Sequence, residues 1–136
     1  MYFEVMGNPK GKARARTGKG FAYTPEKTVL YENLIKQSFQ IANTKKEYYD
    51  SEPLSMFITA YFGIPKSMSK KDRDKITHHA LFPTKKPDAD NIAKVICDAL
   101  NGIAYHDDTQ IVDLNVQKRY TTDEPKVTVE IYEVRI

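Results

Sequence analysis

Two pairs of aspartates in the second half of the chain have a spacing suited to metal chemistry. Asp88 and Asp90 lie two residues apart just after Pro87, and Asp107 and Asp108 are adjacent. Residues two apart in an extended segment point the same way, so both carboxylates of the first pair can reach one cation. Carboxylate oxygens suit Mg²⁺ or Mn²⁺, which also bind substrate phosphates and water. Such ions can activate water and stabilise the extra negative charge of phosphodiester hydrolysis.

A lysine accompanies the first pair. Lys94 follows Asp90 by four residues, one helical turn along the same face, where it can orient a carboxylate or contact a phosphate. The same residue types also have plainer explanations. Asp90 is equally suited to capping a helix, Asp107 and Asp108 to a polar turn, and Lys94 with Asp98 to a surface ion pair.

Charge is distributed unevenly along the chain, although the net charge is only +3. Residues 1–27 carry six basic and two acidic side chains, and residues 64–86 carry seven basic and two acidic ones. Residues 87–113 reverse this balance, with six aspartates against one lysine. Two basic blocks around an acidic block favour a polyanion held around a cation-binding centre, although solvated surface charge explains either basic block alone equally well.

Composition limits the class of protein. A chain of 136 residues with 40% apolar residues suits one globular domain, residues 1–136, with its own core. It has no apolar run of about 18 residues, so no membrane span is expected, and residues 1–6 are too short and too mixed for a signal peptide. The single cysteine, Cys97, favours a reducing, cytoplasmic compartment.

The elements that must position these side chains follow from periodicity. Residues 1–6, 53–63, 110–120 and 126–134 are predicted strands, and residues 7–23 a glycine-rich basic loop. A helix is predicted from Thr24, Pro25 and Glu26 to about residue 43, with its apolar stripe at Val29, Leu30, Leu34, Ile35, Phe39, Ile41 and Ala42. A short basic helix capped by Ser69 ends near His78, and another helix spans about residues 90–101. The fold class is therefore α/β (α+β): one small domain with one mixed sheet and helices on one face.

The acidic segment closely resembles the signature of a known family. Residues 86–102 read KPDADNIAKVICDALNG and residues 107–111 read DDTQI. This pattern resembles the RusA family of Holliday junction resolvases, which are frequent in phages and prophages. The basic opening at residues 7–16, the segment Ala22–Pro25 and the segment Gly63–Ser67 are also similar, so the resemblance covers nearly the whole chain. The chain departs from the family's arginine run in having Lys86-Pro87 before the first aspartate.

The resemblance implies a homodimer with a RusA-like fold that resolves four-way junctions by paired strand nicking in DNA recombination and repair, using Mg²⁺ or Mn²⁺. By motif position, Asp88, Asp90 and Asp108 are the expected metal ligands and Lys94 is the functional lysine, with Asp98 and Asp107 in support. The expected contacts to the DNA backbone are Lys10, Lys12, Arg14, Arg16, Lys70, Lys71 and Arg73.

Two other functions remain open on residue types. One is a non-catalytic recombination accessory protein that binds branched DNA, in which the acids are structural. The other is a metal-binding protein using His78, His79, His106 and Cys97, although adjacent histidines have poor zinc spacing and Cys97 suits the core better. Tyr23 is a candidate for stacking on a base, and His106 for contacting a phosphate.

Overall fold

The protein is described by a computed structural model that covers residues 1–13, 16–18, 20–23 and 25–135, with only the backbone described at Arg16, Phe21 and Tyr23. Its centre is a four-stranded sheet in the order β1-β6-β4-β5. The strands are β1 (Tyr2–Met6), β4 (Leu54–Gly63), β5 (Ile111–Thr121) and β6 (Lys126–Glu133). β6 runs antiparallel to both β1 and β4, whereas β4 and β5 are parallel. The prediction of one mixed sheet within a small α+β domain is confirmed.

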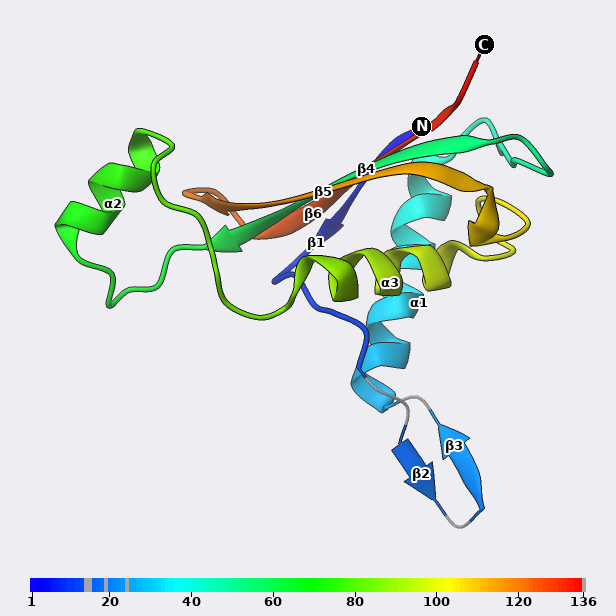
Figure 1. Cartoon of the computed structure of the whole chain (residues 1–136), viewed down its shortest axis with the longest axis horizontal. Helices are drawn as coiled ribbons and strands as arrows, with labels where there is room; N and C mark the ends of the chain where they lie inside the picture. The colour runs from blue at the N-terminus through cyan, green and yellow to red at the C-terminus, as the bar shows by residue number, and fades with distance from the viewer. Residues whose placement is uncertain (14–15, 19, 24, 136) are drawn as a thin grey trace.

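One face of this sheet forms the core. In β4 the alternate residues Leu54, Met56, Ile58, Ala60 and Phe62 are all buried, as their period of two predicts. Two helices cover this face, α1 (Glu26–Ala42) and α3 (Ala89–Leu100), and they lie on the same side of the sheet (Figure 1). The position of the segment around Asp88 and Asp90, at the start of α3, is therefore set by the burial of α3 against β4 and its neighbours.

α3 is held firmly by its apolar side. Its buried residues are Ile92, Ala93, Val95, Ile96, Cys97, Ala99 and Leu100. At 100° per residue, Asp90, Lys94, Asp98 and Asn101 fall within one narrow arc, and this arc is the side left to solvent. Packing thus turns the polar residues of the signature outwards.

The predicted apolar stripe of α1 is partly wrong. Ile35 and Phe39 are buried, together with Thr28 and Tyr31, which the stripe did not include. Its five other members are all exposed, namely Val29, Leu30, Leu34, Ile41 and Ala42. The sequence contains more apolar residues than one helix face can bury, and the tertiary fold selects the face containing Tyr31.

The N-terminal basic segment differs from the predicted plain loop. It contains a short antiparallel hairpin, β2 (Arg16–Gly18) and β3 (Phe21–Tyr23), with Gly20 at a φ of +80° in its turn. Strands of three residues are too short to produce a recognisable alternation. The predicted cap Thr24 lies outside the described residues, and Pro25 stands at the N-cap position of α1.

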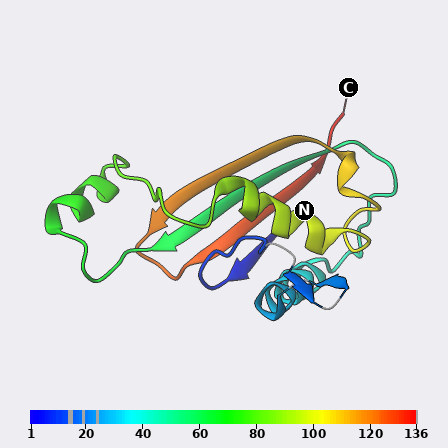
Figure 2. The ribbon, with the colours of Figure 1, turned by 60° about the horizontal axis from the view of Figure 1, so that its bottom comes forward.

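The second basic block forms α2 (Lys70–Thr77), which lies beyond one end of the sheet, away from α1 and α3, in both views (Figures 1 and 2). Its predicted cap is confirmed, since the Ser69 hydroxyl accepts a hydrogen bond from the Asp72 amide at 3.1 Å. Among the described residues, no helix combines the length and the apolar character that crossing a membrane requires.

Candidate active site

The first aspartate pair lies at the N-terminal end of α3. Asp88 takes the N-cap position in an extended conformation (φ −67°, ψ 154°), but its carboxylate makes no capping hydrogen bond. Asp90 follows in the first turn, and both residues are exposed. Within the described part of the chain, neither carboxylate has a hydrogen-bond or ion-pair partner. Both carboxylates are therefore available to a cation from solution.

The second pair lies just beyond the C-terminal end of α3, where hydrogen bonds hold it. The Asp108 amide donates to Asn101 Oδ1 at 2.8 Å, which ties this aspartate to the end of the helix. Asp107 caps the 3₁₀ turn η1 (Asp108–Gln110), accepting from the Thr109 amide, and Gln110 Oε1 accepts from the Asp107 amide at 3.0 Å. The expectation of a polar turn is therefore confirmed for this segment.

Gln110 also connects this turn to the rest of the fold. Its Nε2 donates to the carbonyls of Tyr49 and Glu52 at 3.2 and 3.1 Å. Tyr105, fully buried, donates its hydroxyl to the Cys97 carbonyl at 2.8 Å. Sequence reasoning assigned no role to Gln110, Tyr105 or the amide of Asn101. Their positions within or beside the signature could have indicated that these side chains hold the turn in place.

The pKa values of Asp107 and Asp108 are shifted in opposite directions. Partial burial, the hydrogen bond with Asp107 and the negative charges of Asp107 and Asp98 raise the pKa of Asp108. The pKa of Asp107 is lowered, first by its hydrogen bond with Asp108 and then by the Thr109 amide. The turn therefore concentrates negative potential on Asp108, which is an environment that a bound cation would relieve.

The structure does not bring the three predicted metal ligands together within one chain. Asp90 and Asn101 are eleven residues apart on α3, about 16 Å at 1.5 Å per residue, and Asp108 is tied to Asn101. Among the described residues, no group of three or more histidine, cysteine or acidic side chains is placed to hold a metal ion. Asp88 and Asp90 form one pair, and Asp107 and Asp108 form another at the opposite end of the helix.

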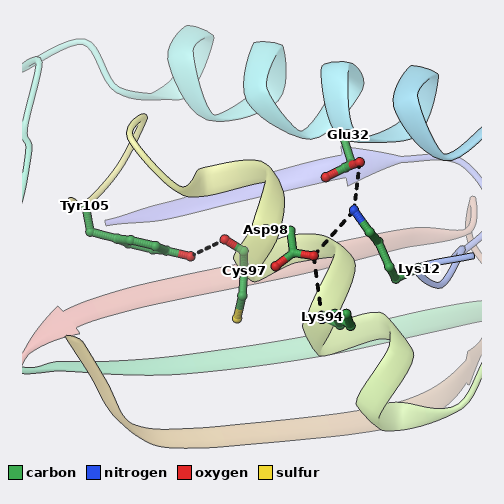
Figure 3. Close-up of polar contacts among 6 residues, drawn as sticks. All are labelled: Lys12, Glu32, Lys94, Cys97, Asp98 and Tyr105. Carbon is green, nitrogen blue, oxygen red and sulfur yellow. Dashed lines mark hydrogen bonds and ion pairs between the residues drawn. The ribbon is translucent and has the colours of Figure 1, made fainter. Parts of the chain in front are cut away.

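Between the two ends of α3, four charged side chains form a network of ion pairs. Asp98 Oδ2 lies 3.9 Å from Lys94 Nζ and 3.4 Å from Lys12 Nζ, and Lys12 Nζ also donates to Glu32 Oε1 of α1 at 3.1 Å (Figure 3). The side chain of Lys94 is 62% exposed and that of Lys12 only 17%. The predicted ion pair between Lys94 and Asp98 is thus present, and nothing in the residue spacing indicated that Lys12 would join it.

Some of the predicted DNA-binding side chains are exposed to solvent, and others already make hydrogen bonds or ion pairs within the chain. Lys70 and Lys71 are exposed on α2, and Lys10 is exposed, with its Nζ 5.8 Å from the centre of the Tyr31 ring. Arg73, in contrast, donates to the carbonyls of Met68, Pro65 and Lys66 at 3.1, 3.0 and 3.2 Å, and so holds the turn before α2. Arg14 and the side chain of Arg16 lie outside the described residues, as does the side chain of Tyr23.

The alternative metal site receives no support among the described residues. Cys97 lies on the buried side of α3, where burial raises the pKa of its thiol to about 11. The His78 ring contacts the Asp74 carbonyl at the end of α2, and His106 is exposed beside the second aspartate pair. These histidines and Cys97 therefore lie on different elements of the fold.

Comparison with known proteins agrees with the signature. The family model described as endodeoxyribonuclease RusA matches residues 5–132. The chain is also similar to a Bacillus subtilis (strain 168) protein described as "Uncharacterized protein YqaN", with 38% identity over 138 residues that cover 97% of this chain and 95% of that protein. The matched region contains both aspartate pairs, Lys94 and the whole of β4 and β5. The chain therefore belongs to the RusA endodeoxyribonuclease family.

Proposed function

We propose that this protein is a Mg²⁺-dependent, structure-selective endodeoxyribonuclease that resolves four-way DNA junctions by paired nicking. The observation that carries the proposal is the exposed carboxylate pair Asp88 and Asp90 at the N-terminal end of α3, without a partner among the described residues. Lys94 stands one turn further along the same exposed face. Family membership supports the reaction class, and the free carboxylates support the requirement for a metal.

The donor set fits magnesium or manganese. Mg²⁺ is commonly held by one or two carboxylates and completes its shell with water and substrate phosphate, so Asp88 and Asp90 suffice as protein ligands for one ion. When bound, the ion would supply an activated water and stabilise charge on the phosphodiester. Lys94, with a mostly exposed ammonium, would contact a non-bridging oxygen of the scissile phosphate and stabilise its added charge.

Asp108 needs a second chain to join this site. Ligands of one Mg²⁺ lie about 2.1 Å from it, far less than the length of α3 that separates Asp108 from Asp90. If a two-fold axis relates two antiparallel α3 helices, the N-terminal end of each helix lies beside the C-terminal end of the other. In the proposed homodimer, Asp88 and Asp90 of one protomer act with Asp108 of the other, and two sites result for two nicks.

Mixed dimers test this arrangement. Asp90→Asn and Asp108→Asn homodimers should both be inactive. A dimer with one chain of each kind should regain one intact site, because one protomer keeps Asp88 and Asp90 while the other keeps Asp108. It should nick one strand without paired resolution. Mixed dimers as inactive as both parents would place all three acids in one chain's site and overturn the shared arrangement.

The direct test of the function is a cleavage assay on a four-way junction, a fork and a linear duplex, with Mg²⁺, Mn²⁺ or EDTA. Symmetric nicking of the junction with either metal, and none in EDTA, is the expected result. Junction binding without nicking under every metal condition would instead favour the non-catalytic accessory function.

The exposed lysines of α2 and Lys10 are proposed as contacts to the DNA backbone. Junction binding in EDTA should weaken steeply with salt, with a slope of about −0.9 per neutralised phosphate in duplex arms. The Lys70→Met/Lys71→Met variant should make that slope shallower by about two. An unchanged slope would remove α2 from the proposed interface.

A further inference from the structure

The N-terminal loop contacts α3 closely enough to suggest a role in the proposed site. The Lys12 amide donates to the Asn91 carbonyl at 3.1 Å, in the first turn of α3. A Cβ on Gly11 would lie 2.9 Å from Asn91 Cβ and 3.1 Å from Pro87 Cβ. Only glycine lets the backbone approach this closely. The loop is therefore seated against the segment that carries Asp88 and Asp90.

This close contact places the ammonium of Lys12 beside two partly buried carboxylates. Glu32 and Asp98 have side chains that are 15% and 27% exposed, and Lys12 Nζ lies 3.1 and 3.4 Å from them. Partly buried carboxylates are costly unless a cation compensates them. Lys12 is the nearer partner of Asp98, since Lys94 Nζ is 3.9 Å from the same oxygen.

We propose that Lys12 is a positioning residue for Lys94: by neutralising Asp98 and Glu32 it keeps the ion pair between Lys94 and Asp98 long, at 3.9 Å, so that the Lys94 ammonium stays available to the phosphate. The four side chains form a neutral set of two cations and two anions (Figure 3). Without Lys12, two carboxylates remain for one ammonium, and Lys94 is the only cation of the set that can move towards them. The inference rests on the proposed function of the α3 site.

The test compares Lys12→Met, which keeps the length of the side chain, with Lys12→Arg, which keeps its charge. We expect Lys12→Met to lower kcat for junction cleavage between about tenfold and a hundredfold, with little change in KM, because the group that assists the phosphate is misplaced. Lys12→Arg should retain most of the activity. Lys45→Met, an exposed lysine after α1, is the matched control and should cleave like the wild type.

Two double variants separate positioning from mere stability. Lys12→Met/Asp98→Asn should recover most of the lost kcat, because the carboxylate that captures Lys94 is gone. In a Lys94→Met background, the further change Lys12→Met should cost little. Gly11→Ala, which unseats the loop without removing a charge, should reproduce the kcat defect of Lys12→Met.

Defined outcomes would overturn the proposal. A wild-type kcat in Lys12→Met contradicts positioning through Lys94. So does a kcat that stays low in Lys12→Met/Asp98→Asn while the melting temperature of that double variant is normal. A raised KM with unchanged kcat and a shallower salt slope would make Lys12 a phosphate contact instead. If the wild-type protein itself does not cut, the proposed function fails. The positioning contact can still be checked through the NMR shifts of the Lys94 side chain, which should change in Lys12→Met.

Discussion

The two ends of α3 carry the same residue type in contrasting surroundings. At the N-terminal end, Asp88 and Asp90 are exposed and have no partner among the described residues. At the C-terminal end, Asp107 and Asp108 belong to a network with Asn101 and Gln110. The Asp107 carboxylate already caps a turn, whereas the carboxylates of Asp88 and Asp90 have no partner among the described residues and can accept a cation.

The difference shows how one helix can serve both structure and chemistry. Burial of the apolar side of α3 fixes both ends at once, and the turn after the helix then fixes Asp108. Substitutions at the N-terminal end of α3 should therefore change activity more than stability. Substitutions in the C-terminal network should change stability, and at Asp108 both stability and activity.

The largest expected effect is that of Asp90→Asn. Loss of a carboxylate that is proposed to bind the metal should reduce junction cleavage by about three orders of magnitude, since metal-assisted charge stabilisation is worth several kcal/mol. Junction binding should persist or tighten, because a negative charge near phosphate is removed. Single-turnover cleavage with Mg²⁺ measures the rate. Asp123→Asn, in the exposed turn before β6, is the control and should cut normally. Wild-type cleavage by Asp90→Asn would remove this end of the helix from the site.

Gln110→Ala tests the opposite end. It removes three hydrogen bonds, to the Asp107 amide and to the carbonyls of Tyr49 and Glu52, so the free energy of unfolding should fall by roughly 1–3 kcal/mol. Urea denaturation measures the change. Gln40→Ala, on the exposed side of α1, should stay within about 0.5 kcal/mol of the wild type. Equal stability of the two variants would mean that the turn is not held as described.

Asp108→Asn separates stability from function at the same end. A raised folded-state pKa means that ionised Asp108 opposes folding at neutral pH, so its neutral isostere should be more stable there in EDTA. The gain should shrink as the pH falls through the raised pKa and vanish below the unfolded value of 3.8, where the wild-type group is protonated in both states. Thermal melts from pH 3 to pH 8 measure it. A gain that grows towards low pH would have the wrong sign and would contradict the described environment.

The smallest expected effect is that of Asp88→Asn on stability. Its carboxylate makes no capping hydrogen bond, so only its favourable interaction with the helix dipole is lost, about 0.3–1 kcal/mol at low ionic strength. High salt should remove most of this difference. A loss of 2 kcal/mol or more, in the range of a full cap, would show that Asp88 is held as firmly as Asp107.

Local pattern was enough to predict the three helices, the four strands of the main sheet and the two acid pairs. The period of two in β4, the Ser69 cap and the apolar side of α3 each depend on neighbours in sequence, and each is observed. The choice of buried face on α1 was not predictable in this way, because it depends on which side meets the sheet. The hairpin β2–β3 was missed because its strands are only three residues long.

The residue pattern alone groups Asp88, Asp90, Lys94 and Asp108 in one signature and predicts a helix between the two aspartate pairs. The fold then keeps the two pairs apart, because the Asp108 amide is held by Asn101 at the far end of that helix, about 16 Å from Asp90 along its axis. It also decided that Lys12, far away in sequence, contacts Asp98 and Glu32. Such contacts arise when separate elements pack on one sheet, and a spacing pattern records only residues near in sequence.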